Sequence, residues 1–200
     1  MLKKAVNSHL KTTIKRKEVI NPLRRHELEL DSVILALYNE AYFCLHAGLY
    51  NSALSMQFQL LERLTKDVYK IVFPEINEEE VEEEDWGKLL DNLQKYFQQN
   101  KWKILVYRID LVIWIKRTGM RNKHIHVDIK EITKKLNIPA YKVNLKERIM
   151  EQETLLGNSP VVKKYEAEFY NKTVSFLANY LFPYTTEAVK EMIKIKKYFK

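Results

Sequence analysis

Glycine, proline and cysteine are all scarce in this 200-residue chain, which has four glycines, five prolines and one cysteine. Sheet proteins need many tight turns, and glycine and proline are the residues that favour them, so their scarcity points to long helices. Because Cys44 is the single thiol, the chain can form neither an intrachain disulfide nor a cysteine-based zinc site.

Long apolar runs are also missing. The N-terminus, Met1-Leu2-Lys3-Lys4, is not followed by the apolar segment of a signal peptide. The longest apolar stretch is too short to span a bilayer, and Arg108 and Asp110 interrupt it. We therefore expect a cytoplasmic protein without a membrane partner.

The sequence lacks several familiar catalytic signatures. It has no G-x-S-x-G nucleophile elbow, no glycine-rich phosphate loop and no dinucleotide fingerprint. Cys44 lies in the middle of an apolar helical pattern, so we interpret it as a buried core thiol rather than a nucleophile. No cofactor is expected.

Apolar residues recur at helical spacing along most of the chain. Asp31-Ser32 and Asn51-Ser52 are suitable N-terminal caps for the first two helices, which Gly48 and Pro74 end. The predicted helices cover residues 30–47, 51–73, 86–99, 102–116, 128–136, 145–156, 160–182 and a last basic segment to Phe199. The short link between the first two helices indicates an antiparallel helical hairpin. The sequence thus predicts an all-α fold.

The end of the chain is expected to hold two separate helices. Pro183 should end the helix over 160–182, and Thr185-Thr186-Glu187 should cap the last one. That last helix carries several lysines, which would help to hold RNA.

Charge is distributed unevenly along the chain, and the net formal charge is +8. Residues 1–27 form a basic N-terminal arm, and residues 28–200 are expected to form one helical domain. Within that domain, residues 75–85 are rich in glutamate, which predicts a solvated loop because like charges repel. The positive balance is compatible with a nucleic acid partner.

The densest group of reactive side chains is Arg121-Asn122-Lys123-His124-Ile125-His126. Histidine suits proton transfer near neutral pH, and the planar guanidinium of arginine matches phosphate oxygens. RNA carries its own nucleophile, so a base, a proton donor and a cation are sufficient to cleave it. An alternative is a metal site of His124, His126 and Asp128 on an extended segment, although Lys123 would repel the ion.

The segment Arg121-Asn122-x-x-x-His126 resembles the R-x4-6-H motif of the HEPN superfamily, including the polar residue after the arginine. The resemblance implies an up-and-down helical bundle with additional C-terminal helices. It further implies a metal-independent endoribonuclease whose site forms at a homodimer interface, in a toxin or phage-defence setting. By position, Arg121, Asn122 and His126 would be the catalytic residues, and an antitoxin or defence-system protein would be a further partner.

A different class of function stays open beside the enzyme. The chain could be a non-catalytic helical interaction or RNA-binding module. In the first case Arg121 and His126 would form salt bridges inside one subunit, and in the second the protein would bind RNA without cutting it.

Overall fold

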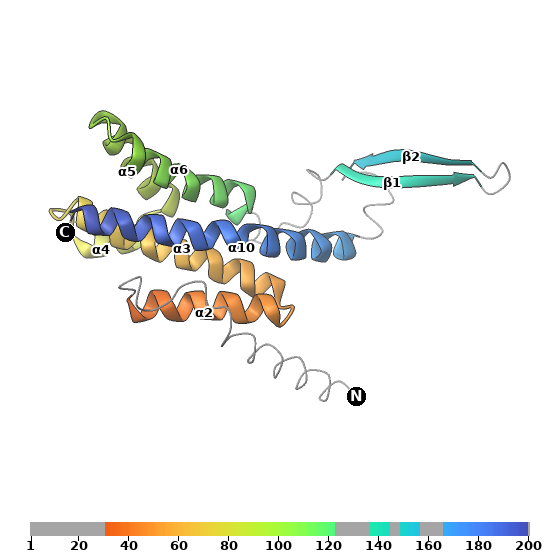
Figure 1. Cartoon of the computed structure of the whole chain (residues 1–200), viewed down its shortest axis with the longest axis horizontal. Coiled ribbons are helices and arrows are strands. Elements are labelled where there is room, and N and C mark those ends of the chain that lie inside the picture. The colour runs from red at the N-terminus through yellow and green to blue at the C-terminus, as the bar shows by residue number, and fades with distance from the viewer. Residues whose placement is uncertain (1–30, 123–136, 145–148, 157–165, 200) are drawn as a thin grey trace. The chain divides into compact units, whose positions relative to one another are not determined.

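The computed structural model describes residues 31–122, 137–144, 149–156 and 166–199 (Figure 1). The elements in chain order are α2 (Ser32–His46), α3 (Tyr50–Val72), α4 (Glu78–Glu83), α5 (Trp86–Gln99), α6 (Lys103–Thr118), β1 (Asn137–Asn144), β2 (Ile149–Leu156) and α10 (Glu166–Phe199). The chain divides into two compact units, one of residues 1–119 with 177–200 and one of residues 120–176. In the first unit every described element is a helix, as the sequence predicts.

The first helix of the hairpin follows the capping pattern of the sequence, whereas the second does not. The Asp31 carboxylate accepts a hydrogen bond from the Val33 amide at 2.7 Å, which satisfies one of the free donors at the start of α2. Gly48 adopts a positive φ of 76° just after the helix, a conformation that glycine reaches without steric cost. The short link then lets α3 pack against α2, and both helices confirm the predicted ranges. Asn51-Ser52, expected to cap the second helix, lies inside α3, whose N-cap Leu49 makes no side-chain hydrogen bond.

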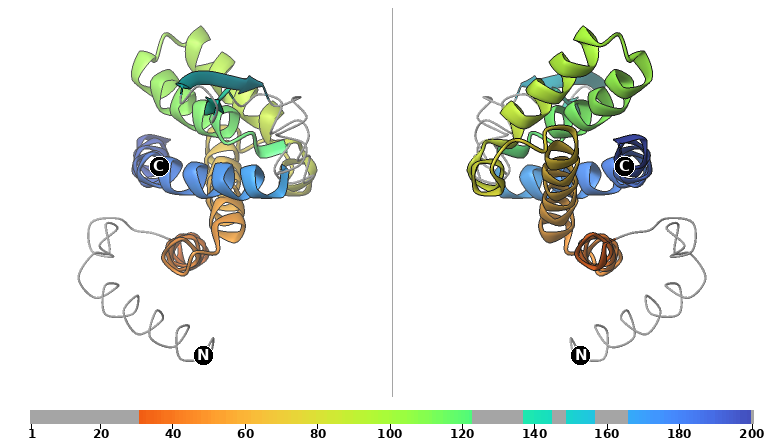
Figure 2. Two further views of the ribbon diagram at one scale, coloured as in Figure 1. Left: turned by 90° about the vertical axis from the view of Figure 1, so that its right-hand side faces the viewer. Right: turned by 90° about the vertical axis from the view of Figure 1, so that its left-hand side faces the viewer.

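The core of the first unit lies between these helices and the α5–α6 pair, with the C-terminal part of α10 packed among them. Figures 1 and 2 show α2 on one side of α3 and the α5–α6 pair on the other. Cys44 is buried in this core, as predicted.

Polar side chains inside the core bond to one another or to the backbone. The Gln57 amide donates to the Ala178 carbonyl at 3.1 Å and accepts from the Thr185 hydroxyl at 3.0 Å. The Tyr38 and Thr186 hydroxyls lie 3.0 Å apart. Each bond joins α10 to α2 or α3, so the network fixes how α10 sits on the hairpin without leaving a buried polar group unsatisfied.

The prediction of two C-terminal helices was wrong, because α10 runs unbroken through Pro183. A proline inside a helix removes one backbone hydrogen bond, here to the Asn179 carbonyl. Pro183 itself is exposed, and Gln57 binds the neighbouring Ala178 carbonyl. Thr185 and Thr186, expected as a cap, lie instead in the helix interior and are buried. Tertiary contacts therefore outweigh the local break signal.

A second correction concerns residues 145–156, predicted as a helix. Ile149–Leu156 forms β2, which pairs antiparallel with β1. The register places Lys142 opposite Glu151 and Val143 opposite Met150. The predicted helix over 128–136 lies outside the described residues. The hairpin is the one described departure from the all-α prediction.

The acidic run 75–85 is not simply a loop. It contains the short helix α4, whose N-cap Asn77 accepts from the Glu79 amide at 3.1 Å. Val81 is buried, and Glu82 bonds to cations of α3. Lys70 lies 2.7 Å and Lys66 3.3 Å from its carboxylate. Cations on the neighbouring helix thus offset the repulsion among carboxylates that predicted a loop.

Candidate functional site

Helix α6 leads directly into the predicted motif, and its end is held tightly. The Gly119 amide bonds to the Ile115 carbonyl at 2.9 Å as the helix closes. A Cβ at Gly119 would lie 2.5 Å from Phe58 Cζ and 2.9 Å from Leu181 Cδ1. No other residue fits this position without moving α3 or α10. Helix α6 ends at Thr118, two residues beyond the predicted end at residue 116, and Gly119 lets it pack closely on both neighbouring helices.

Arg121 and Asn122 follow immediately after Met120, which takes a left-handed φ of 49°. Both residues are helical. Arg121 is partly buried and Asn122 is exposed. The Arg121 guanidinium donates from Nη1 to the Asn122 side-chain oxygen at 3.2 Å. The asparagine therefore restrains one edge of the guanidinium, which is the role a polar residue beside a catalytic arginine would need.

The remaining predicted residues lie outside the described part of the chain. His126 is one of them, as are Lys123, His124 and Asp128 of the alternative metal site. Within the described ranges, no group of three or more histidine, cysteine, aspartate or glutamate side chains is placed to hold a metal ion. The structure thus brings together Arg121 and Asn122 of the predicted three residues.

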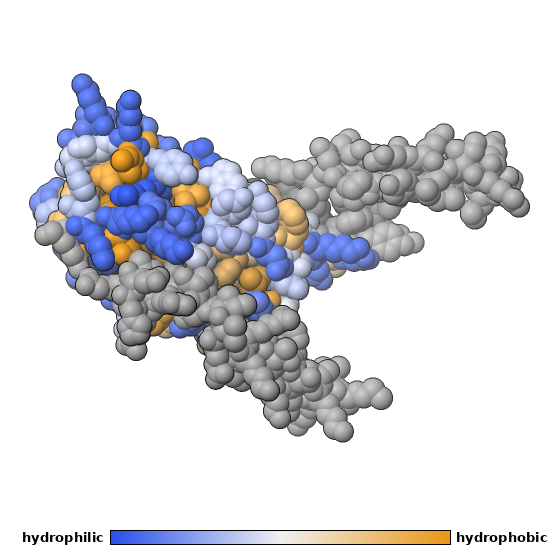
Figure 3. All heavy atoms as spheres, in the orientation of Figure 1, coloured by the Kyte–Doolittle hydropathy of each residue, from blue (hydrophilic) through white to orange (hydrophobic). Residues whose placement is uncertain are grey.

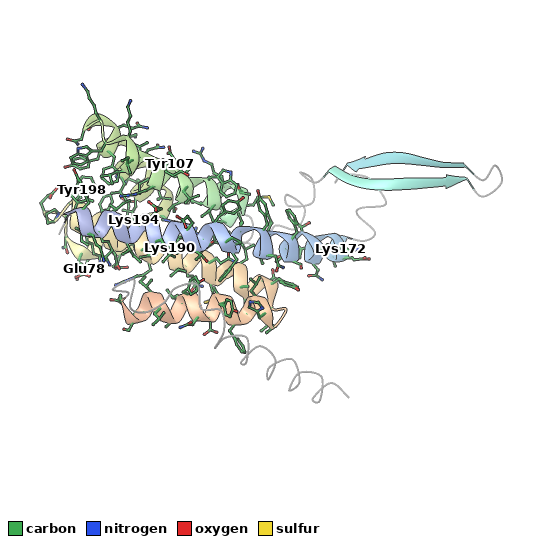
Figure 4. All side chains as sticks on the ribbon, in the orientation of Figure 1. Glu78, Tyr107, Lys172, Lys190, Lys194 and Tyr198 are labelled. Carbon is green, nitrogen blue, oxygen red and sulfur yellow. The ribbon has the colours of Figure 1, made fainter. Side chains whose placement is uncertain are left out.

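Three lysines in the C-terminal part of α10 are paired with carboxylates of the first unit. Lys194, labelled in Figure 4, pairs with Glu191, and Lys196 lies 3.0 Å from Asp67 of α3. Lys190 lies 4.0 Å from a third carboxylate, that of Glu187. These pairs lower the positive charge that the sequence suggested for this helix, so α10 is a weaker phosphate-binding surface than its composition indicates.

Glu191 lies at the centre of the contact between α6 and α10. The Arg108 Nε atom is 2.7 Å from its carboxylate, and both side chains are largely shielded from solvent. Burial alone would raise the pKa of Glu191, but hydrogen bonds from Lys194 and Arg108 together outweigh it, so the pKa lies below the ordinary glutamate value. The carboxylate is therefore charged at neutral pH and ties α6 to α10.

An exposed aromatic cluster lies where α6 and α10 meet. Trp114 is 4.9 Å from Tyr184 and 6.3 Å from Tyr180 between ring centroids. The three side chains are 38–41% exposed. Exposed aromatic groups of this kind are enriched at binding surfaces.

This cluster is not predicted from the sequence. Residues 102–116 are predicted as a helix, and its many apolar residues do not by themselves show which side of the helix is exposed. The available signal was the regular spacing of Ile104, Tyr107, Leu111 and Trp114 on the side opposite the core.

No helix among the described residues is long and apolar enough to cross a membrane.

Comparison with known proteins adds no assignment, since no protein-family model, curated protein or solved structure matches this chain.

Proposed function

We propose that the protein is a metal-independent endoribonuclease of the HEPN type that acts as a homodimer. The observation that supports this most directly is the hydrogen bond between Arg121 and Asn122. It joins the first two residues of the motif directly after the apolar helix α6, at the start of the second unit. A planar guanidinium can donate two parallel hydrogen bonds to phosphate oxygens, which suits Arg121 to a phosphate ligand.

The chemistry needs only groups that the motif supplies. A base removes the proton of a ribose 2′-hydroxyl, and the 2′ oxygen attacks the adjacent phosphorus. The bond from phosphorus to the 5′ oxygen breaks, and that oxygen takes a proton, which leaves a cyclic phosphate and a free 5′-hydroxyl. In this proposal His126 transfers a proton and Arg121 stabilises the negative charge that develops on the phosphate.

A single copy of the motif offers one arginine and one histidine, whereas the reaction needs a base, a proton donor and a cation. Two chains related by a two-fold axis would offer two of each, and such dimers are the commonest oligomers. One histidine could then act as base and the other as acid. This is why the proposal includes a homodimer with a shared site.

The test is cleavage of single-stranded RNA in EDTA by the purified chain. Wild type should cut, and His126→Ala should lose about 100-fold or more of the rate, the usual contribution of a general acid or base. His124→Ala is the matched control, because it removes the neighbouring imidazole that is not part of the motif, and it should cut at nearly the wild-type rate.

Two results would overturn the assignment. Undiminished cleavage by His126→Ala would remove the histidine from the reaction. Cleavage that requires a divalent ion and is lost equally in His124→Ala would favour the metal site of His124, His126 and Asp128. For the cellular setting, a toxin or defence role predicts that expression of wild type slows growth and that His126→Ala does not.

The exposed aromatic cluster favours a second candidate, a non-catalytic helical interaction module. Trp114, Tyr180 and Tyr184 offer a binding surface that needs no chemistry. Under this alternative the protein binds its partner, RNA stays intact at every protein concentration, and the His126→Ala variant binds the partner as wild type does.

A further inference from the structure

Helix α6 is apolar on two opposite sides, and the described chain covers one of them. Its inner side chains, Leu105, Ile109, Val112, Ile113 and Ile115, are buried in the core. On the other side lie Ile104, Tyr107, Leu111 and Trp114, which we name the outer face of α6. Ile104 and Tyr107 are each 68% exposed. A contiguous exposed apolar stripe on a helix is a feature of interaction surfaces, so this face is a candidate site for a partner.

The spacing of the outer face is that of a helix seam. Its four residues recur at intervals of three, four and three, which is the pattern with which two helices interlock. One border of the seam carries exposed charges seven residues apart, namely Lys103, Asp110 and Arg117. Their signs alternate, so the border offers both an anion and a cation to whatever packs on the face.

The exposed aromatic area is large enough to form a substantial part of a protein interface. It comes from Tyr107 on the outer face, from Trp114, and from Tyr180 and Tyr184 of α10 beside it. Full burial of one aromatic side chain removes about 150–250 Å², so the exposed fractions amount to roughly 400 Å². That is about half of one partner's share in a standard protein interface, which is about 800 Å².

Charge favours a protein over RNA as the occupant. Asp110 borders the face on α6, and the exposed Glu187 follows Tyr184 on α10. Both carboxylates would repel a phosphate backbone. In Figure 3, strongly hydrophilic residues lie between apolar and pale ones on the face of the molecule turned to the viewer. Lys103 and Arg117 also border the outer face, so its border is of mixed sign. Mixed charges suit a protein surface better than the uniform negative charge of a nucleic acid backbone.

We propose that a second copy of this chain packs its own α6 antiparallel on this face, around a two-fold axis that passes between Leu111 and Trp114. Leu111 of one copy then meets Trp114 of the other, and Tyr107 lies against the last turn of the opposite helix. In the same register Asp110 of each copy faces Arg117 of the other, so the alternating border is complementary to itself. The inference rests on the proposed function for the need of two copies, and it assigns the face on which they pair. Around this axis the two Gly119 residues lie about 20 Å apart along the helix. A shared site therefore requires the segments after Gly119 to turn back towards the axis, and the positive φ of Met120 breaks the helix at that point.

The experiment measures mass without RNA, by sedimentation of the full chain across a range of concentrations. Wild type should sediment as a dimer. Leu111→Arg and Trp114→Arg should sediment as monomers, while Val33→Arg, which places the same charge at a half-exposed apolar position of α2, should remain dimeric.

A charge exchange tests the register itself. Asp110→Arg alone and Arg117→Asp alone each place like charges opposite one another at two symmetric positions, and each should weaken dimerisation about 10-fold. The double variant restores both pairs with their signs reversed and should return to within about threefold of wild type. The two residues are seven positions apart on one helix, too far to pair within a chain. These positions are exposed, so folding should survive, and circular dichroism checks it.

The outcomes separate the proposals. A monomeric wild type, or single reversals whose losses simply add in the double variant, overturns the pairing face. A change in RNA affinity by Trp114→Arg at unchanged mass would overturn it in favour of nucleic acid. A dimer that fails to cut RNA would instead contradict the proposed function and leave the pairing face intact.

Discussion

Helices α3 and α6 both turn an apolar face to the core, but their outer faces differ in kind. The outer face of α3 carries Arg63, Lys66 and Lys70, and the chain covers it with α4, whose Glu78 and Glu82 pair with these cations. The outer face of α6 is largely exposed at Ile104 and Tyr107 and touches α10 at Trp114, which packs against Tyr184. The short acidic helix α4 thus covers the charged outer face of α3, whereas we propose that a second copy of the chain covers the apolar outer face of α6.

The difference between the buried and the exposed side of α6 is tested most strongly by replacing an isoleucine with alanine on each side. Ile109 is fully buried, and Ile104 is 68% exposed. Ile109→Ala should lower the free energy of unfolding by about 2–5 kcal/mol, because it removes buried groups and leaves a cavity. Ile104→Ala should change it by less than about 0.5 kcal/mol. Urea unfolding in the monomeric Leu111→Arg background measures both, and equal losses would contradict the assignment of the two sides.

A second change acts on the end of α6. Gly119→Ala places a Cβ against Phe58 and Leu181, which are themselves fixed in the core. Overpacking of this kind costs about 1–3 kcal/mol of stability. Gly48→Ala, where a Cβ meets nothing within 4 Å but φ is positive, is the matched control for backbone strain without a clash. An unchanged unfolding midpoint for Gly119→Ala would show that the end of α6 is looser than described.

The cover of α3 can be tested through its single buried side chain. Val81 of α4 is 1% exposed, and Val81→Ala removes two methyl groups, which predicts a loss of about 1.5 kcal/mol at about 0.8 kcal/mol each. Glu80→Ala, on an exposed neighbour, should have little effect. Thermal unfolding compares the two, and similar behaviour would mean that α4 is not packed on α3.

The ion pairs of that cover should contribute least. Exposed pairs are worth about 0–1 kcal/mol, so Lys70→Ala should cost less than about 1 kcal/mol at pH 7. The hydrogen bond from Lys70, with help from Lys66, lowers the pKa of Glu82 against the opposing effect of burial.

The pH dependence of this pair follows from the sign of that shift. A carboxyl with a lowered pKa in the folded chain stabilises the fold above its unfolded pKa of about 4.3. That contribution disappears as the pH falls through the folded value. The stability difference between wild type and Lys70→Ala should therefore shrink as the pH is lowered from 7 towards 3. A difference that grows on acidification would contradict the pairing.

Local signals were sufficient for the helices whose caps and apolar stripes agree with the packing. Asp31 and Gly48 mark the ends of α2, and α6 ends at Thr118, close to the predicted end at residue 116. Local signals failed where contacts between residues distant in the sequence determine the secondary structure. Pro183 is a strong stop signal locally, but contacts of α10 with Gln57 and Tyr38 hold the helix together. The strand pairing of Ile149–Leu156 likewise depends on a segment that precedes it in the chain.

The candidate site shows the same contrast between features set by local sequence and features set by packing. The motif identified Arg121 and Asn122, and the bond between them is a local contact of adjacent residues. The outer face of α6 escaped notice because burial is set by the surrounding helices. Ile104 and Ile109 are the same residue type on one helix, and only the packing of α5 and α10 distinguishes them.

The claim that two chains share one site is tested most directly by mixing two inactive variants. Arg121→Ala and His126→Ala, coexpressed with different tags and purified as the mixed pair, retain one arginine and one histidine on opposite chains. If both chains contribute to one site, the mixed pair should cut RNA in EDTA well above either parent variant. Cleavage no faster than that of the parents, in a pair shown to be dimeric, would contradict a shared site.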